Sequence, residues 1–386
     1  MRVTFIGCPF RTSYGHYIES LRRTLQTHYG EHVDWVASNC GCGDPIERER
    51  RFEAKPSAYF EMGHIGDYES HTAWKRVLRR GARNLTYQAR TRRYVTLAGG
   101  SDVVHLQQTL NAYGAMVAFH WLRRPTPAAK VITVHEIDRH QTQFPHLNTL
   151  YNRADAVIVH GSELRTRLLE YGVEPARVHV LPYGTDLPES PDERERAGIV
   201  FYGGHHLLSG KGLDTLLRAA ALLRERLGER APLITLHGHY GTETPAEALE
   251  LAERLGVADR LIWVNQIDDN DIAALYRTAQ LAVLPYTGSA AGLPACAAAA
   301  NGLPVIATRR AGIPDQLGEC AAWIEPGDPA QLAAEIQRLL ADPLARAALA
   351  RRAYERAQAE LSWTAVAGRT LELYRAALRA RAGARS

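Results

Sequence analysis

Residues 281–308 hold the pattern that most constrains the fold of this chain, because they read in turn as a strand, a glycine loop, a helix and a second strand. The first segment, 281–284, is wholly apolar, as expected for a parallel strand covered on both faces. Pro294 then opens an alanine-rich helix that ends at Gly302, and a second apolar segment follows at 304–308. This order predicts two parallel strands joined by a helix.

The loop before that helix is a candidate phosphate site. It contains Ser289 and ends at Gly292 and Leu293, which lie at the expected helix N-terminus. Backbone N–H groups without a partner and the helix dipole both favour an anion at such a place. We therefore expect Gly292 and Leu293 to offer their amides to a diphosphate.

Apolar segments alternate with helical segments along the whole chain, which has 386 residues. The expected strands cover residues 1–7, 33–37, 102–106, 130–135, 155–160, 178–181, 198–202, 232–237, 260–264, 281–284, 304–308 and 321–324. This alternation predicts doubly wound parallel sheets, and the length suits two domains of about 150–200 residues. A proline- and charge-rich stretch at 186–198 lacks periodicity and is the predicted linker. We expect one domain over residues 1–187, completed by a C-terminal helix within 361–386, and a second over 198–360.

The composition excludes several classes of protein. Apolar residues make up 46% of the chain and charged residues 23%, which is typical of a globular protein. No apolar run approaches the roughly 18 residues of a membrane span, and the first run is too short for a signal peptide, so we expect a cytoplasmic protein. Five scattered cysteines without a zinc-type His/Cys spacing predict no metal site.

The net charge of +4 comes almost wholly from arginine, because the chain has only four lysines. Residues 75–93 form a basic segment of helical character, which we interpret as a solvated face. The alternative is peripheral contact with the inner face of an anionic membrane or with an acidic acceptor. Nucleic acid is disfavoured as a partner, because no base-reading motif or interleaved aromatic residues accompany the basic side chains.

Lys211 is the one lysine of the C-terminal half, and glycines surround it. The stretch from Gly204 to Gly212 comes close to a nucleoside-triphosphate-binding loop, but five residues instead of four separate Gly204 from Gly210. Gly212 also stands where such a loop has a Ser or Thr that binds magnesium. We reject a triphosphatase on these two counts.

The segment 292–305 also resembles the donor-binding signature of retaining GT-B glycosyltransferases of family 4. The usual text of that signature is E-G-F-G-L-P-x-L-E-A-M-A-x-G-x-P-V. The match runs without a gap and includes Gly292, Leu293, Pro294, Gly302, Pro304 and Val305. Both glutamates of the signature are missing, because Ser289 and Ala297 stand where the family commonly has them.

Segments of the N-terminal half carry the same resemblance. His135, in TVHEID at the end of an expected strand, is similar to a family histidine that approaches the donor sugar. Residues 157–184 are similar to the family pattern V-I-x-x-S followed by V-x-V-I-P-N-G-V-D. Gly15, just ahead of an expected helix, resembles the N-terminal glycine loop that faces the family's cleft, although a plain structural turn explains it equally well.

The loop around Lys211 resembles the family segment G-R-x-x-x-x-K-G, whose lysine neutralises the departing diphosphate. Lys211 and Gly204 carry over from that segment, whereas His205 or His206 stands near the place of its arginine. The resemblance therefore implies that Lys211 and His135 are catalytic. It implies a donor site formed by Gly15, the 204–206 segment, Lys211, Ser289, Gly292 and Leu293.

The resemblance implies an α/β fold of the GT-B type, in which two Rossmann-like doubly wound domains face each other across a cleft. It implies transfer of a sugar, with retention of anomeric configuration, from a nucleotide-diphosphate sugar to a sugar, lipid-linked or small-molecule acceptor. No protein cofactor and no metal are expected, because lysine, loop amides and a helix dipole stabilise the leaving diphosphate. The alternatives are a catalytically silent GT-B binding or scaffold protein and a pseudo-glycosyltransferase with an atypical donor. A sugar epimerase is disfavoured, because the marked positions lack acid/base carboxylates.

Overall fold

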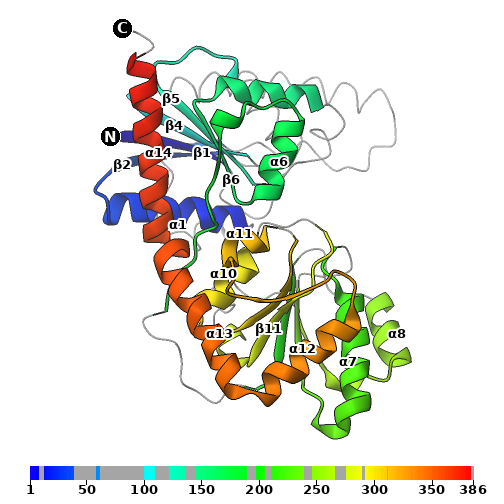
Figure 1. Cartoon of the computed structure of the whole chain (residues 1–386). Coiled ribbons are helices and arrows are strands. Elements are labelled where there is room, and N and C mark those ends of the chain that lie inside the picture. Colours follow the sequence, from blue (N-terminus) through cyan, green and yellow to red (C-terminus); the bar gives the residue numbers. More distant parts are fainter. Residues whose placement is uncertain are drawn as a thin grey trace. The chain divides into compact units, whose positions relative to one another are not determined.

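The computed structural model describes residues 1–7, 13–38, 58–60, 100–108, 121–135, 145–188, 197–204, 210–238, 246–265, 275–288, 292–310 and 312–383. Contacts between residues divide the chain into two compact units, which Figure 1 shows in the colours of the sequence. Unit 1 comprises Met1–Leu181 and Val366–Ser386, and unit 2 comprises Pro182–Ala365.

Unit 1 is built on a seven-stranded parallel sheet in the order β3-β2-β1-β4-β5-β6-β7. Its strands are β1 (Arg2–Gly7), β2 (His32–Ser38), β3 (Ala58–Phe60), β4 (Val103–Gln108), β5 (Ala129–Val134), β6 (Ala156–Val159) and β7 (Val178–Val180). Strands β5 and β6 are buried along their whole length, as the apolar runs predict for parallel strands covered on both faces. The edge strand β3 was not predicted.

Helices α1 (Ser13–Thr27) and α6 (Ser162–Glu170) pack on this sheet, with the short 3-10 turns η2 (Pro145–Arg153) and η3 (Pro175–Arg177) between strands. The apolar side chains of α1 recur at helical spacing, and Tyr17, Ile18, Leu21 and Leu25 are all fully buried. This apolar face is the one that packs on the sheet.

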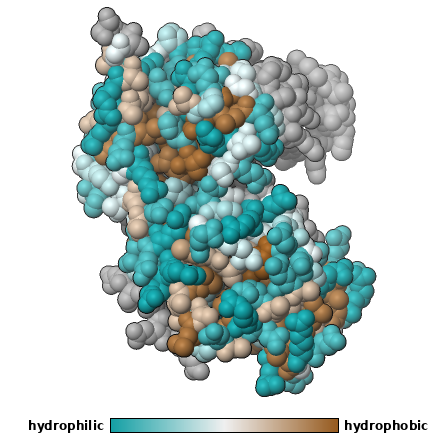
Figure 2. Space-filling model, in the orientation of Figure 1, coloured by the Kyte–Doolittle hydropathy of each residue, from teal (hydrophilic) through white to brown (hydrophobic). Residues whose placement is uncertain are grey.

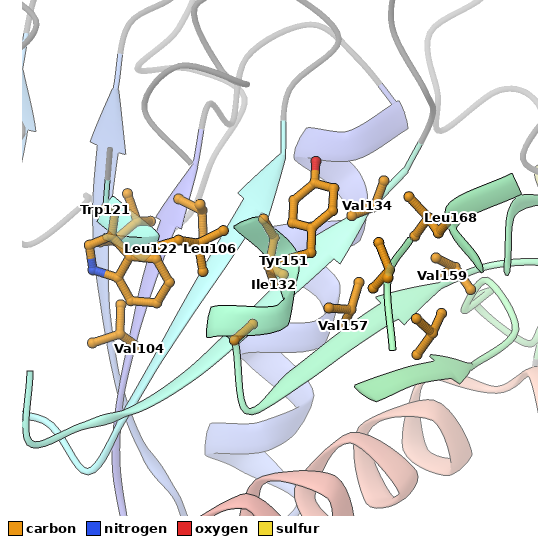
Figure 3. Close-up of a cluster of buried hydrophobic side chains, with 14 of the residues drawn as sticks. Val104, Leu106, Trp121, Leu122, Ile132, Val134, Tyr151, Val157, Val159 and Leu168 are labelled. Atoms are coloured by element: carbon orange, nitrogen blue, oxygen red, sulfur yellow. The ribbon is translucent and has the colours of Figure 1, made fainter. Parts of the chain in front are cut away.

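The core of unit 1 gathers side chains from β4, β5, β6 and η2 (Figure 3). Its labelled members are Val104, Leu106, Trp121, Leu122, Ile132, Val134, Tyr151, Val157, Val159 and Leu168. Full burial of such a side chain contributes roughly 1.5–3 kcal/mol, so this cluster is a main source of the stability of unit 1. It fixes the strands whose carboxyl ends carry His135 and its neighbours.

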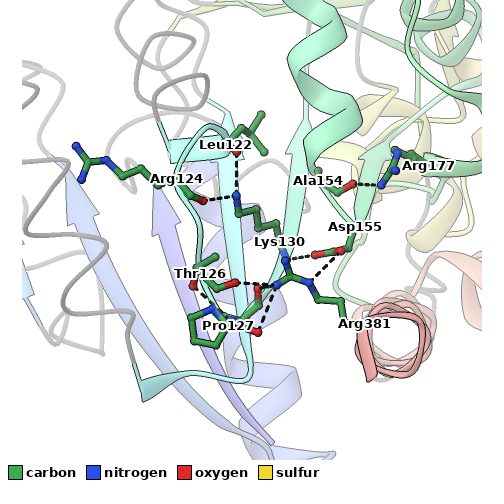
Figure 4. A network of polar contacts seen from close by, with 10 residues as sticks. Leu122, Arg124, Thr126, Pro127, Lys130, Ala154, Asp155, Arg177 and Arg381 are labelled. Atoms are coloured by element: carbon green, nitrogen blue, oxygen red, sulfur yellow. Dashed lines mark hydrogen bonds and ion pairs between the residues drawn. The ribbon is translucent and has the colours of Figure 1, made fainter. Parts of the chain in front are cut away.

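The C-terminal helix α14 (Trp363–Gly383) is fixed to unit 1 near its end by Arg381. The guanidinium Nη1 donates to the carbonyls of residues 126–128, at 3.2 and 3.3 Å for the first two (Figure 4). Its Nε lies 3.3 Å from Oδ1 of Asp155, and the other oxygen of Asp155 accepts from the backbone N–H of Lys130 at 2.6 Å. One arginine thus joins the end of the chain to the start of β5.

Unit 2 is built on a six-stranded parallel sheet in the order β10-β9-β8-β11-β12-β13. Its strands are β8 (Ile199–Gly204), β9 (Ile234–Gly238), β10 (Leu261–Asn265), β11 (Leu281–Leu284), β12 (Val305–Thr308) and β13 (Ala322–Ile324). Strands β11 and β12, which flank the glycine loop, are buried at every residue. The strand–loop–helix–strand unit that the sequence predicted is therefore present.

The helices of unit 2 are α7 (Leu213–Leu227), α8 (Ala246–Arg254), α10 (Leu293–Ala300), α11 (Ile313–Leu317), α12 (Pro329–Ala341) and α13 (Pro343–Arg356). The turns η4 (Gly228–Arg230) and η5 (Ala258–Arg260) precede strands, and a π-helical turn η6 (Ala357–Leu361) follows α13. Asp328 and Asp342 cap α12 and α13, each accepting a backbone N–H at 2.9 Å with proline at the next position. This is the signature of a strong helix start.

The chain enters unit 2 ahead of the stretch 186–198 that the sequence indicated as the linker. The N–H of Thr185 donates to the carbonyl of Leu361 at 2.8 Å, and the N–H of Trp363 donates to the carbonyl of Thr185 at 3.3 Å. A Cβ on Gly184 would lie 2.2 Å from the Trp363 ring, so only glycine fits there. These contacts bind residues 182–185 to unit 2, and the division accordingly falls between Leu181 and Pro182.

The α/β class with two doubly wound parallel sheets, expected from the sequence, is confirmed. In the part of the chain that the structure describes, no helix has both the length and the apolar character needed to cross a bilayer. On the face that Figure 2 shows, hydrophobic residues occur in separate patches among hydrophilic ones. The basic segment 75–93 lies outside the described residues, so its contact with a membrane or an acceptor stays a prediction.

Candidate functional site

Each sheet reverses its strand order at one pair of neighbouring strands, and ligands of such sheets bind beyond the carboxyl ends at that pair. In unit 1 the pair is β1 and β4, and in unit 2 it is β8 and β11. Gly204 is the last residue of β8, and Lys211 follows in the loop to α7. Gly292 follows β11 at the start of α10. The structure thus places Gly204, Lys211 and Gly292 at the switch point of unit 2.

The Lys211 loop is fixed by hydrogen bonds to the loop after β11. The N–H groups of Thr287 and Gly288 both donate to the carbonyl of Gly210, at 3.0 and 2.9 Å. Gly210 and Gly212 have φ values of 71° and 72°, which is the left-handed region that favours glycine. Gly212 is also the N-cap of α7, so the lysine stands directly before a helix N-terminus.

The two loops approach so closely that side chains on the glycines would not fit. A Cβ on Gly212 would lie 2.0 Å from the carbonyl oxygen of Pro285, and a Cβ on Gly210 would lie 3.2 Å from Cα of Gly288. The side chain of Lys211 is partly exposed, and its Nζ lies 4.3 Å from the centre of the Tyr286 ring. The lysine is therefore held by the same loop at its backbone and at its charged end.

The start of α10 offers two backbone amides to an anion. Gly292 is the N-cap with φ 76°, and a Cβ there would lie 2.7 Å from Cγ of Gln316, which is buried. The N–H groups of Ala295 and Cys296 donate to the carbonyl of Gly292, and Pro294 has no N–H. In the described part of this turn, the amides that remain for a ligand are those of Gly292 and Leu293, and α10 starts at these residues as predicted.

Three histidines from three neighbouring strands lie together in the core of unit 1, two of them at the carboxyl ends of their strands. His105 lies on β4, His135 directly follows β5, and His160 directly follows β6. All three are at most 2% exposed. Nδ1 of His135 lies 2.9 Å from Nε2 of His160, and Nε2 of His135 lies 3.0 Å from the side-chain amide of Gln107. The ring of Tyr17 packs edge-on against His135 and His160.

The partners of these rings determine where their protons lie. Nδ1 of His160 faces the carbonyl of Leu181 at 3.2 Å, so a neutral His160 donates from Nδ1 and accepts at Nε2. His135 then donates from Nδ1 to His160, and its Nε2 can only accept. Gln107 must therefore turn its NH2 group toward His135. Its side-chain oxygen then takes the amide position that lies 3.1 Å from Nε2 of His105, and it accepts a hydrogen bond from that nitrogen.

Burial keeps this cluster neutral. It lowers the pKa of His105 to about 3 and of His160 to about 4, and it lowers the pKa of His135 well below its usual value of 6.5. Nδ1 of His105 accepts from the hydroxyl of Tyr374 at 2.5 Å, and its Nε2 lies 2.7 Å from Oγ1 of Thr133. At neutral pH these histidines are therefore hydrogen-bonding groups and not proton donors in acid catalysis.

Three of the predicted site residues lie outside the described residues: His205, His206 and Ser289. Gly15 was expected in a loop ahead of a helix, but it lies inside the first turn of α1. The helix starts earlier because the buried face that begins at Tyr17 outweighs the roughly 1 kcal/mol by which glycine disfavours a helix. Its predicted contact with a ligand is not tested by this difference.

Sequence reasoning missed several partners of the predicted residues. His160 ends an apolar strand as His135 does, in VIVH beside VITVH, so the shared strand-end position was an available signal. Tyr286 and Gln107 gave no signal of their own. Within the described ranges, no group of three or more His, Cys, Asp or Glu side chains is placed to hold a metal ion.

Two family models match the chain. The family described as Glycosyltransferase Family 4 matches residues 15–189, and the family described as Glycosyl transferases group 1 matches residues 196–342. The two matches lie side by side and together span most of the chain. They fall on the two halves whose motifs resembled this group of proteins.

Curated relatives are about 30% identical to the chain over the residues that align. An MMP alpha-(1->4)-mannosyltransferase of Mycolicibacterium hassiacum is 30% identical over 280 residues, which are 71% of this chain and 64% of that protein. A D-inositol 3-phosphate glycosyltransferase of Salinispora tropica is 30% identical over 276 residues, 65% of this chain and 54% of that protein. The match thus spans less than two thirds of the length of these relatives.

Solved structures share the fold over almost their whole length. Sucrose-phosphate synthase from Thermosynechococcus elongatus has a TM-score of 0.74 and 22% identity, with 98% of this chain and all of that chain covered. HepE from Anabaena, solved in complex with UDP and glucose, has a TM-score of 0.71 and 18% identity, with 96% and 98% covered. These structures therefore share the fold of this chain, including both of its parallel sheets.

Proposed function

Because the chain belongs to the family-4-like glycosyltransferases of the GT-B fold, we propose that it transfers a sugar from a nucleotide-diphosphate sugar to an acceptor with retention of anomeric configuration. One observation carries this proposal. Lys211 and the free amides of Gly292 and Leu293 lie in the two loops that leave the switch-point strands of unit 2. A cation and two aligned N–H donors suit a departing diphosphate.

The reaction breaks the bond between the anomeric carbon of the donor and the phosphate oxygen. The electron pair of that bond stays on the diphosphate, where Lys211 and the α10 amides stabilise the charge. The acceptor hydroxyl oxygen bonds to the anomeric carbon on the face that the diphosphate leaves, and the hydroxyl proton passes to the departing phosphate. Neither a metal ion nor a protein cofactor is required by this scheme.

His135 enters the proposal as a neutral group that orients the donor sugar. Both of its ring nitrogens already hold partners, His160 at Nδ1 and Gln107 at Nε2. A sugar hydroxyl could replace Gln107 as the partner of Nε2, whereas the hydrogen bond from Nδ1 to His160 must remain because it determines the tautomer of His135. His135 would then accept a hydrogen bond from the sugar at Nε2.

The donor and acceptor are proposed by class. HepE was solved with UDP and glucose, and the relatives are named as sugar transferases, so uridine-diphosphate sugars are the first donors to test. The acceptor is a sugar, a small molecule or a lipid-linked molecule. Peripheral contact of residues 75–93 with the cytoplasmic face of a membrane would bring the last of these within reach.

The first experiment screens the protein for thermal stabilisation by a panel of nucleotide sugars, because a ligand at 100 times its dissociation constant adds about 2.7 kcal/mol. Lys211→Ala is then compared with Arg218→Ala, which removes an exposed cation from the neighbouring helix α7. Lys211→Ala should lower turnover by roughly 10²–10³, and Arg218→Ala should not. Unchanged turnover in a folded Lys211→Ala protein would refute the assignment.

The rival hypothesis, a catalytically silent GT-B scaffold or a pseudo-glycosyltransferase, rests on Ser289 and Ala297, which replace the family's glutamates. The Lys211 loop opposes it, because a scaffold does not require a lysine clamped between two left-handed glycines. Binding of a nucleotide sugar without any transfer or hydrolysis would favour this rival.

A further inference from the structure

We propose that Tyr286 is a positioning residue for Lys211, and that the face of its ring holds the lysine ammonium where the diphosphate of the proposed reaction would lie. This inference rests on the proposed function. Nζ of Lys211 lies 4.3 Å from the ring centre, well within the roughly 6 Å at which a cation is attracted to an aromatic face. No motif marked Tyr286 in the sequence.

The ring of Tyr286 is a fixed platform. Its side chain is fully buried, and its hydroxyl donates to the carbonyl of Tyr202 on β8 at 2.6 Å. Its own carbonyl accepts from the hydroxyl of Thr308, at the end of β12, at 2.6 Å. Tyr286 is thus tied to the strands on both sides of β11, and its ring cannot follow a lysine that moves.

The backbone of Lys211 is held by the same loop that carries the ring. The residues on both sides of Tyr286 lie close to the glycines on both sides of Lys211. A Cβ on Gly212 would lie 2.0 Å from the carbonyl oxygen of Pro285, and the carbonyl of Gly210 accepts from the N–H of Thr287. Both ends of a flexible side chain are therefore set before any ligand arrives. Such preorganisation lowers the entropy that is lost when a charge must be ordered around a ligand.

An aromatic partner differs from an acidic one in what it leaves for the ligand. A carboxylate would hold the ammonium equally well but would neutralise much of its charge, whereas a ring attracts the cation and remains uncharged. Burial raises the pKa of the Tyr286 hydroxyl well above 10, so the residue stays neutral. The ring thus positions the lysine and itself adds no charge that would compensate the ammonium.

The kinetic test compares Tyr286→Leu, Tyr286→Phe and Lys211→Ala with the wild type, using the nucleotide sugar that the donor panel identifies. Tyr286→Leu should lower kcat about 3- to 30-fold, the range of a cation–π contact, while Tyr286→Phe keeps the ring and most of the activity. Tyr151→Leu is the matched control, because it removes an equally buried tyrosine from the core of unit 1. In the Lys211→Ala background, Tyr286→Leu should have no further effect.

The contact itself has a readout that needs no donor. The chain has four lysines, so reductive ¹³C-methylation gives few lysine signals, and the signal of Lys211 is the one absent from Lys211→Ala. Ring current should shift that signal upfield in the wild type and in Tyr286→Phe, and the shift should vanish in Tyr286→Leu. Absence of the shift in the wild type would overturn the inference.

The outcomes separate this inference from the proposed function. If Lys211→Ala lowers turnover but Tyr286→Leu does not, or if both Tyr286 variants lower it equally, the positioning role is overturned and the proposed function stands. If Lys211→Ala leaves turnover unchanged, the proposed function fails.

Discussion

The buried histidines of unit 1 predict a loss of stability in mild acid. Burial lowers the pKa of His105 to about 3 and of His160 to about 4, whereas in the unfolded chain both have the ordinary pKa of about 6.5. Below that pH the unfolded chain therefore binds protons that the folded chain excludes. Stability is complete above about pH 7 and falls progressively as the pH falls from about 6.5 toward about 3–4.

The size of the effect follows from the two pKa values. At pH 5, a histidine whose pKa falls from 6.5 to 3 or 4 lowers the free energy of unfolding by about 2 kcal/mol, because one pKa unit corresponds to about 1.4 kcal/mol. His105 and His160 together then remove about 4 kcal/mol, out of a total that is typically about 5–15 kcal/mol. Near pH 5.5 each contributes a slope of about 1 kcal/mol per pH unit.

Urea unfolding of the full chain, measured between about pH 7 and pH 5, tests this prediction, since ordinary carboxyl groups titrate below that range. His160→Gln removes one titrating group and keeps a polar side chain at that position. Its free energy of unfolding will be lower at neutral pH, but its dependence on pH should be shallower by about 1 kcal/mol per pH unit. His28→Gln is the control, because His28 is exposed in the folded chain.

The result that would refute the reasoning is an equal pH slope for the wild type and His160→Gln. Equal slopes would mean that His160 binds its proton in the folded chain as readily as in the unfolded one. The neutral tautomers assigned to His135 and Gln107 would then fall with it, because they depend on a His160 that donates only from Nδ1.

The remaining predictions concern anchors and the donor. Arg381→Ala should lower the free energy of unfolding by about 1–3 kcal/mol in thermal or urea denaturation, because it strips three carbonyls and Asp155 of a charged donor, whereas Arg379→Ala on the exposed face of α14 should be neutral. Gly212→Ala should cost at least about 2 kcal/mol and reduce turnover, since strain at positive φ adds to the clash with Pro285; Gly256→Ala, with φ 67° and open space, isolates the strain alone. Because Ala297 has no hydrogen-bond acceptor where the family commonly has a glutamate, a 2′-deoxyribonucleotide donor should bind in calorimetry nearly as well as its ribonucleotide counterpart. A tenfold or greater loss of affinity would instead reveal a ribose-binding group.

Much of the fold could be predicted because parallel strands covered on both faces must be apolar along their length. The runs that became β5, β6, β11 and β12 are buried at every residue, and their ends were predicted to within two residues. The three-residue strand β3 could not be predicted, because Ala58–Phe60 is too short to show any period. Strands could therefore be predicted where burial requires a run of at least four apolar residues.

Residues of the candidate site could be predicted only where a few consecutive residues of one loop form a recognisable pattern. Gly292 and Leu293 precede a proline at a helix start, and Lys211 stands between glycines, so each was visible in a few consecutive letters. The partners that fix them are distant in sequence. Lys211 meets Tyr286 across the switch point of the sheet. In the histidine cluster, likewise, His105 bonds to Tyr374, 269 positions away. Such pairs depend on topology, which no local pattern records.

Ala297 shows how the structure limits the explanations for a departure from the family signature. Its neighbours on α10, Cys296 and Ala298, are fully buried, and Sγ of Cys296 contacts Oε1 of Gln316 at 3.1 Å, so packing requires small residues there. Ala297 itself is partly exposed. The burial that requires small residues at 296 and 298 therefore does not extend fully to 297. We expect the missing carboxylate to affect ligand binding beside α10 instead. The proposed diphosphate site consists of Lys211 and the α10 amides and does not include residue 297, so on this proposal the nucleoside part of donor recognition can vary independently of the diphosphate part.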